Sequence, residues 1–430
     1  MKLQDLHIHI KFLRFQAKNI ALKWPIRIFS SFVILAFLSP FIANDKPLIC
    51  KYKGEWLFPA FSFQNKKTIN YNNEVEIINY NMGKEWKLLE TSFVLFPPCA
   101  YSPNTIDADN APLKSPFDKQ YMTIKNSVVS LPIAYRHWFG TTQNGNDVLS
   151  AIIHGTKISL SVGIFGMLLA SIIGISLGAI AGYYQNNTFK IGYFQFGFLV
   201  LSLVFAWFYS IKIRQDELVN SFNNGGIGVL MQLILSAAIF FSISYVFSWI
   251  GKKIDHLINK NSQIFFPFDL VISKLIEILN SIPVLLLIIS VAAIAKPSYL
   301  FLILILGFLS WTNIARIVRA EFIKAKHLDY VMACKAIGIS NTRIIIKHIL
   351  PNILPILFVQ IMFGMAGAVL IESALSFIGV GVPLNVVSWG SLLNEGQNSF
   401  SSWWLIIFPG VCVFTLILIY NKIATHLSKK

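Results

Sequence analysis

The chain has 430 residues, of which 55% are hydrophobic and only 13% are charged, and its mean hydropathy is +0.61. A soluble core cannot absorb this much apolar surface, so the composition indicates an integral membrane protein and excludes a pair of soluble domains. The net charge of +16 does not indicate a nucleic-acid partner, because the basic residues are scattered between apolar stretches rather than gathered in one domain.

The chain begins with a basic segment, residues 1–25, that precedes the first apolar stretch at 26–43. Asn44, Asp45 and Lys46 follow this stretch, where a cleaved leader would carry small residues at its cleavage site. We therefore interpret 26–43 as an uncleaved anchor and as the first transmembrane helix.

Seven further stretches are suited to crossing a hydrocarbon layer of ~30 Å, which takes about 20 residues of helix. They occupy residues 158–184, 191–211, 227–250, 275–295, 298–315, 353–381 and 403–420. Most Lys and Arg residues gather in alternate loops, whereas the short loops on the other side carry only Lys212, Arg214 and Lys296. By the positive-inside rule both termini are cytoplasmic, including the tail 422–430.

The long polar region 44–157 is extracytoplasmic in this topology. It contains dense turn signals, such as Phe96-Pro97-Pro98, and alternating patches, such as 74–80, that suit short strands. We predict a small domain of β-rich or irregular structure. Cys50 and Cys99 both lie in this oxidising compartment and are candidates for a disulfide.

Within the stretch 158–184, small residues recur at every fourth position: Gly166, Ala170, Gly174, Gly178 and Gly182. Positions i and i+4 share one face of a helix, and a ridge of nearly bare backbone allows close helix packing in a membrane. We predict a packing role for this glycine ridge, with a place in the substrate path as the alternative.

The loop between 298–315 and 353–381 has the pattern of a docking element. It consists of a basic amphipathic helix, a stop at Gly338, a second short helix and Pro351 just before the next span. A helix–glycine–helix pair between two spans is shaped to dock on a cytoplasmic partner. The alternative is a basic loop that faces solvent and lipid headgroups.

This loop resembles the "EAA" coupling motif of ABC-importer permeases, in which Glu-Ala-Ala is followed by three residues, Gly, and about ten residues later Leu-Pro. Met332 stands where the family has Glu, and Cys334 stands where it often has Ala. Asp329, one helical turn earlier, is a candidate to replace the missing carboxylate. The resemblance implies that the following residues contact an ATPase subunit: Asp329, Tyr330, Met332, Ala333, Lys335, Gly338, Leu350 and Pro351.

A second stretch, His137-Trp138-Phe139-Gly140-Thr141 continuing to Asp147, resembles the His-x-x-Gly-Thr-Asp-x-x-Gly-Arg-Asp signature of the second, or C-type, permease of dipeptide and oligopeptide importers. Thr142 replaces Asp and Asn146 replaces Arg. The resemblance covers roughly 136–184 and 269–421, together with the first span. The stretches 191–211 and 227–250 form an extra helix pair where the family normally has a short cytoplasmic loop, and a pair preserves the topology.

The resemblance implies an all-α polytopic membrane protein with the ABC-importer permease fold, about eight transmembrane helices and an extracytoplasmic insert. The core helices are then 269–421 and the coupling loop is 316–352. Implied partners are a second related permease, two ATP-binding subunits, an extracytoplasmic solute-binding protein and the lipid bilayer of the bacterial inner membrane. No cofactor, metal or catalytic residue is implied, and no Gly-x-x-x-x-Gly-Lys-Ser/Thr sequence for ATP occurs.

Four residues are candidates for the translocation path or gate: Ser281, Pro283, Glu372 and Trp389. Glu372 is a carboxylate within an apolar span, where it either makes a structural hydrogen bond to a neighbouring helix or lies in the substrate path. Pro283 is expected to kink its span.

Two other functional classes are alternatives to an ABC-importer subunit. An ion-coupled secondary transporter favours several intramembrane acids and two similar halves, whereas the chain has one clear acid deep in a span and no internal repeat. A membrane-embedded transferase needs His or Asp residues clustered at one membrane face. Neither alternative explains the coupling loop.

Overall fold

The computed structural model describes residues 20–62, 66–71, 74–89, 91–124, 127–186, 190–224, 227–258, 263–294, 298–381, 383, 386–399 and 401–428. Most of the predicted N-terminal segment and the last two residues of the predicted tail lie outside the described residues. The chain divides into two compact units, Met1–Gly163 with Ala366–His426 and Ile164–Met365 with Leu427–Lys430.

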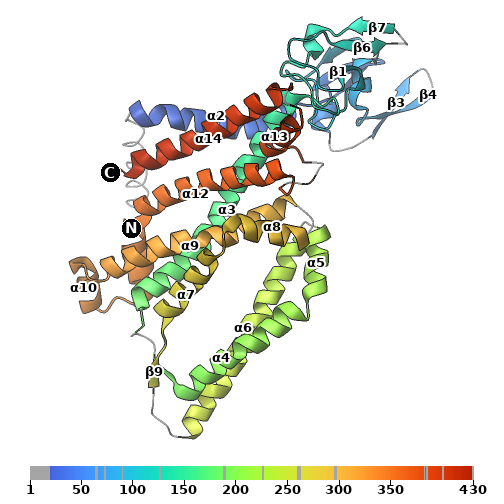
Figure 1. Ribbon diagram of the computed structural model, residues 1–430. Coiled ribbons are helices and arrows are strands. Elements are labelled where there is room, and N and C mark those ends of the chain that lie inside the picture. The colour runs from blue at the N-terminus through green and yellow to red at the C-terminus, as the bar shows by residue number, and fades with distance from the viewer. Residues whose placement is uncertain are drawn as a thin grey trace. The chain divides into compact units, whose positions relative to one another are not determined.

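Seven helices within the described residues are long and apolar enough to cross a membrane, and an eighth span results if one bent pair is counted (Figure 1). The seven are Lys23–Ile42, Val148–Tyr184, Tyr193–Lys212, Gly228–Leu257, Tyr299–Ala325, Asn341–Ile378 and Trp404–Ser428. The predicted all-helical polytopic fold with about eight transmembrane helices is therefore confirmed. Several helices extend beyond the predicted spans, because hydropathy marks only the hydrocarbon part of a helix.

The bent pair corrects the single span predicted at 275–295. Helix α7 (Phe268–Ser281) ends before Pro283, α8 (Val284–Ile294) begins after it, and the two helices meet at an angle of 79°. Proline lacks an N–H group and pushes the residue before it out of the helical region. Ile282 is accordingly extended, with φ −96° and ψ 126°, so Pro283 breaks the span rather than kinking it.

In the first unit, a polar insert lies between α2 (Ile20–Ile42) and α3 (Val148–Tyr184). Its strands form a sheet of order β2-β1-β5 and two hairpins, β3-β4 and β6-β7. The strands are β1 (Ile49–Tyr52), β2 (Glu55–Leu57), β3 (Lys66–Tyr71), β4 (Glu74–Asn79), β5 (Phe93–Leu95), β6 (Tyr121–Ile124) and β7 (Ser127–Ser130). A small core that includes Cys50, Leu57 and Trp86 fills the space beneath the three-stranded sheet. The strand predicted near 74–80 is present.

Helix α3 begins at Val148, ten residues before the predicted start, and this shortens the insert to residues 44–147. The side chain of Asp147 accepts a hydrogen bond of 2.6 Å from the backbone N–H of Ser150, which satisfies a free donor at the helix N-terminus. The first turns of α3 carry the polar residues His154 and Thr156, so hydropathy alone placed the start too late.

The rest of the first unit consists of the second half of α12 (Leu350–Ile378), the short helix α13 (Trp389–Gln397) and α14 (Trp404–Ser428). Residues of α3, α13 and α14 share a buried cluster that includes Ile152, Leu392 and Leu405. The rings of Phe29 in α2 and Tyr420 in α14 lie 5.6 Å apart. Helix α2 is thereby packed along α14.

In the second unit, the second half of α3 packs along α9 (Tyr299–Ala325). Their shared core includes Trp311, Ile314 and Phe322, and residues of α7 and of the first half of α12 belong to the same cluster. Between α9 and α12 lie α10 (Asp329–Ala336), the single turn α11 (Asn341–Arg343) and the π-helical segment Ile344–Ile349.

The predicted extra helix pair is also part of the second unit (Figure 1). Helix α4 (Tyr193–Trp207) continues into a π-helical segment (Phe208–Lys212) and packs along α6 (Ile227–Leu257), with the unpredicted short helix α5 (Gln215–Asn224) between them. Strands β8 (Lys190–Gly192) and β9 (Gln263–Phe265) pair at its base. The carboxylate of Asp255 caps α4 by accepting hydrogen bonds from the backbone N–H groups of Phe194 and Gln195, at 3.0 and 2.9 Å.

Candidate functional site

The loop between α9 and α12 folds as a small structure with one buried and one exposed face. Val331 of α10 and Ile344 and Ile349 of the following segment are fully buried in the core of the second unit. This apolar face fixes the loop on the ends of the membrane helices. The loop therefore has a defined fold that is packed on the membrane helices, and it is not an unstructured, solvent-exposed linker.

Gly338 ends α10 in the left-handed conformation, with φ +78°. The backbone N–H of Gly338 bonds to the carbonyl of Lys335 at 3.0 Å, and that of Ile339 bonds to the carbonyl of Cys334 at 3.0 Å. This is the glycine C-cap that turns a chain sharply after a helix. The helix–glycine–helix pattern predicted from the sequence is present, and the glycine has the positive φ that only this residue adopts without strain.

The exposed face of this structure carries most of the residues predicted to contact an ATPase. Asp329, Ala333, Lys335 and Gly338 are exposed, and the Met332 side chain is 51% exposed. Two of the predicted residues are instead partly buried, namely Tyr330 and Leu350, which pack against the core, while Pro351 is exposed in the first turn of α12. The face is thus mixed, with an apolar side chain where the family places its glutamate.

Two further contacts connect the helix ends near this loop. The guanidinium of Arg319 in α9 forms a two-pronged ion pair with Asp269 in α7, with Nη2 at 2.7 Å from Oδ2. Asn186, just after α3, accepts a hydrogen bond of 3.1 Å from the backbone N–H of Leu270. Paired arginine–carboxylate bonds have a fixed geometry, so α3, α7 and α9 are held together at this end.

The glycine ridge of α3 faces α9. A Cβ atom on Gly174, Gly178 or Gly182 would lie 2.5–2.8 Å from atoms of α9, closer than real Cβ atoms approach. Ala170 is fully buried, and Gly166 is less crowded, with the carbonyl of Ile303 at 3.7 Å from such an atom. The ridge therefore lies where α3 and α9 approach each other closely.

Glu372 and Trp389, two of the predicted path residues, are fully buried in the first unit. The Glu372 carboxylate accepts hydrogen bonds from the hydroxyls of Ser159 and Ser376, both at 3.0 Å. The Trp389 indole N–H donates to the carbonyl of Ile152 at 3.0 Å. These contacts join α12 and α13 to α3, and they match the structural alternative for Glu372 that the sequence left open.

The other two predicted path residues belong to the second unit. Ser281 and Pro283 are exposed at the break between α7 and α8, and the Ser281 hydroxyl donates to the carbonyl of Ile278 at 2.7 Å. The hydroxyl thereby satisfies a carbonyl at the end of α7.

The His137 signature forms a buried polar cluster at the start of α3. Nδ1 of His137 lies 2.8 Å from Asp147 Oδ2, Nε2 lies 3.1 Å from Asp107 Oδ2, and the ring stacks on Tyr101 at 4.1 Å. Burial lowers the pKa of His137, but hydrogen bonds and the charges of the two aspartates raise it by more, so the net shift is upward. The cluster fastens the insert to the cap of α3.

Lys87 also belongs to this cluster, because its Nζ lies over the Tyr101 ring, 3.1 Å from the ring centroid. Burial lowers the pKa of Lys87 to about 7, although nearby aspartates, Asp107 first among them, act in the opposite direction. Sequence reasoning missed this residue, because nothing in the local pattern marks a surface-type lysine that folds inward.

The predicted disulfide is not present. Cys50 and Cys99 are free, buried thiols. Cys50 lies in the core beneath the three-stranded sheet, whereas the thiol of Cys99 donates to Asp147 Oδ1 at 3.3 Å in another cluster. Shared compartment and loop length permitted a bridge, but the fold of the insert buries the two side chains separately.

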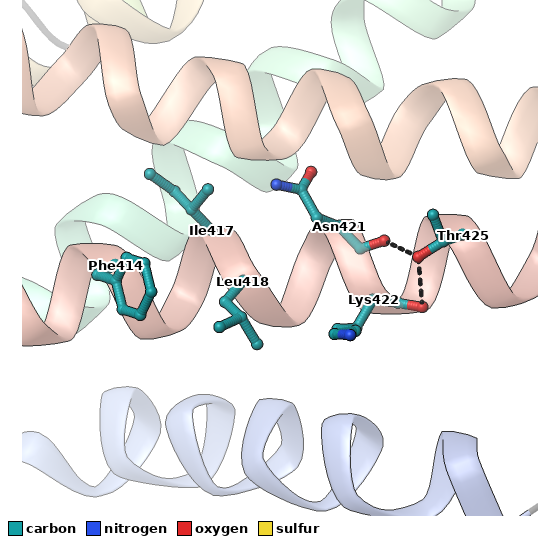
Figure 2. A pocket seen from close by; sticks show the side chains of 6 residues that line it. All are labelled: Phe414, Ile417, Leu418, Asn421, Lys422 and Thr425. Atoms are coloured by element: carbon teal, nitrogen blue, oxygen red, sulfur yellow. Dashed lines mark hydrogen bonds between the residues drawn. The ribbon is translucent and has the colours of Figure 1, made fainter.

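A groove of about 270 Å³ follows α14 and is lined by Phe414, Ile417, Leu418, Asn421, Lys422 and Thr425 (Figure 2). The Thr425 hydroxyl donates to main-chain carbonyls of its own helix, as Figure 2 shows. The lining is mainly hydrocarbon. In the part of the chain that the structure describes, no group of three or more His, Cys, Asp or Glu side chains is placed to hold a metal ion.

Helices of membrane-spanning length, joined in one place by a folded loop that is anchored on them, define a polytopic membrane protein of the transport-subunit class. Residues 261–430 match the family described as binding-protein-dependent transport system inner membrane component. The chain is 30% identical over 297 residues to a permease protein assigned to a peptide transport system in Brucella abortus, covering 69% of this chain and 73% of that protein. The chain therefore belongs to this family of ABC-importer permeases.

Two longer matches extend over the insert and the extra helix pair. The inner membrane ABC transporter permease protein YejE of Escherichia coli is 26% identical over 400 residues, covering 92% of this chain and 89% of that protein. The peptidoglycan transport system permease protein YejE of Agrobacterium fabrum is 24% identical over 393 residues, covering 89% and 81%.

The predicted identity and function are confirmed at the level of an ABC-importer permease. The chain is a non-catalytic inner membrane subunit that works with other ABC transport components. The comparisons support neither the ion-coupled transporter nor the membrane-embedded transferase.

Proposed function

We propose that this chain forms half of the translocation path of an ATP-driven importer for peptides or peptide-bearing solutes. In this proposal it pairs with a second related permease, binds one of two ATP-binding subunits and receives solute from an extracytoplasmic binding protein. Two of the relatives described above have names that state a cargo, which is peptide in one and peptidoglycan in the other. A peptide moiety is common to both cargoes, and this supports the substrate class.

The observation that carries the coupling role is the exposed face of α10 and Gly338. Buried Val331 anchors α10 on the membrane helices, while Met332 and Ile337 are 51% and 76% exposed. Exposed apolar side chains on an anchored, capped helix favour a protein partner over bulk solvent. An ATP-binding subunit that binds this face would move α10, and with it the ends of the membrane helices on which α10 is anchored.

The orientation follows from the distribution of Lys and Arg. With the α10 loop in the cytoplasm, the insert and the tip of the extra helix pair are extracytoplasmic. Reporter fusions at Asn223 should then score outside, and fusions at Lys260 should score inside. An inside score at Asn223 would reject this topology.

Gly338→Asp tests the coupling role. Aspartate at φ +78° is strained, and its charge alters the docking face. Gly54→Asp is a matched control, because Gly54 has φ +86° and, like Gly338, has no atom within 4 Å of a Cβ. Tagged complexes of both variants would be purified with their partners, and ATP hydrolysis and peptide uptake would be measured in proteoliposomes.

The proposal predicts that Gly338→Asp abolishes uptake, with the ATP-binding subunit either lost on purification or hydrolysing ATP without moving peptide. Gly54→Asp should retain uptake and partners. Equal uptake by the two variants would remove the coupling assignment.

A further inference from the structure

Tyr183 occupies the last turn of α3 and is only 3% exposed, although it lies next to the loop that carries α10. Its hydroxyl donates a hydrogen bond of 2.7 Å to the side-chain oxygen of Asn341, the first residue of α11. The bond joins a membrane helix directly to the loop. The two residues are 158 positions apart in the sequence, so no local sequence pattern could predict this hydrogen bond.

The ring of the same tyrosine faces two lysines. Nζ of Lys335 in α10 lies 5.5 Å from the ring centroid, and Nζ of Lys326 at the end of α9 lies 5.9 Å from it. Cations at this distance are attracted to the electron-rich ring. Burial and the nearby charge of Lys335 lower the pKa of Lys326.

One side chain of α3 thus contacts the end of α9, α10 and α11. Beside it, Gly182 lies so close to α9 that a Cβ there would come within 2.5 Å of the Arg319 carbonyl. The end of α3 therefore cannot slide independently of α9. A displacement of α10 must either carry α3 with it or break the contacts of Tyr183.

We propose that Tyr183 is a positioning residue that transmits the displacement of α10 to membrane helix α3 through its hydroxyl bond to Asn341 and its contacts with the two lysines. This inference rests on the proposed coupling function. It assigns to one side chain the connection between the docking face and a helix that also carries the glycine ridge.

Tyr183→Phe isolates the hydroxyl, because phenylalanine keeps the ring and its contacts with the lysines. Asn341→Ala removes the same hydrogen bond from the other side, at an exposed position. Tyr245→Phe is the control, since Tyr245 is 73% exposed on α6. Each variant would be purified in the complete importer, and peptide uptake and ATP hydrolysis would be measured on the same proteoliposomes.

The readout is the number of peptides moved per ATP hydrolysed, together with the melting temperature of the complex. We expect Tyr183→Phe to lower this ratio by about fivefold, because one net hydrogen bond changes the equilibrium between the intact and the broken contact by about that factor. The melting temperature of the complex should fall by only about 2–4 °C, the shift expected for the loss of one such bond. Asn341→Ala should lower it similarly, and the double variant should be no worse than either single variant, because both remove one contact.

A wild-type ratio in assembled Tyr183→Phe, or a ratio equal to that of Tyr245→Phe, overturns the inference. If Tyr183→Phe fails to assemble, Asn341→Ala decides, with a lowered ratio in support and an unchanged ratio against. Failure of the underlying function looks different, because the wild-type complex would then show no ATP-dependent uptake and Gly338→Asp would have no effect.

Discussion

Replacing Gly178 with alanine tests whether the glycine ridge sets the spacing of α3 and α9. The new Cβ would lie 2.6 Å from the carbonyl oxygen of Ala315 and 2.8 Å from the Cβ of Val318. Carbon–oxygen contacts normally begin near about 3.3 Å, so the two helices must separate by several tenths of an ångström. Forcing extra volume into a packed contact typically costs about 1–3 kcal/mol.

Gly197→Ala supplies the control on another membrane helix. Gly197 lies in α4 with no atom within 4 Å of a Cβ, so alanine there gains about 1 kcal/mol of helix propensity without a clash. Thermal unfolding of the purified complexes in detergent should show a lower melting temperature for Gly178→Ala and an equal or higher one for Gly197→Ala. Equal effects of the two substitutions would refute the close packing of α3 on α9.

Three further predictions concern Asp329 with Met332, His137 and Glu372. If the ATPase contact is electrostatic, Asp329→Ala should reduce peptide uptake more than Met332→Ala, because a carboxylate can pair with a basic partner whereas methionine offers only apolar packing. The raised pKa of His137 stabilises the fold below the unfolded value of about 6.5, and this contribution is lost as pH rises through the folded pKa. The stability difference between wild type and His137→Gln should therefore shrink from pH 6 to 8.5 in melting experiments. Glu372→Leu should destabilise the protein by about 1–3 kcal/mol, because it removes the acceptor of buried serine hydroxyls, and Glu372→Gln should cost less.

Each of these has a contrary outcome. A silent Asp329→Ala with a damaging Met332→Ala would make the contact hydrophobic. A pH-independent difference for His137→Gln would remove the imidazolium from the cluster. Equal melting temperatures for the two Glu372 variants would show that its hydrogen bonds do not stabilise the helix contact.

The spans, the extra helix pair and the turn at Gly338 could be predicted because their signals are local. Apolar length identifies a transmembrane helix, fourth-position spacing identifies a helix face, and a glycine after a short helix identifies a cap. Hydropathy failed at helix ends, where α3 extends into polar sequence before 158 and α9 extends into basic sequence beyond 315.

The contacts that organise the candidate site were not predictable in this way. Tyr183 and Asn341 are far apart in the sequence, and neither residue type is unusual in its own segment. The burial of Lys87 over Tyr101 likewise depends on how the insert folds back on itself. The disulfide prediction failed for the same reason, because loop length does not decide which core receives each cysteine.

In the proposed function, the loop carrying α10 is the surface on which an ATP-binding subunit docks. A photoreactive amino acid at Met332 tests this most directly, with one at Trp56 in the insert as a control, since the two side chains are 51% and 52% exposed. On irradiation of the assembled importer, we expect a covalent adduct between the Met332 position and the ATP-binding subunit, and none from Trp56. No such adduct from Met332, or an equal one from Trp56, would contradict it.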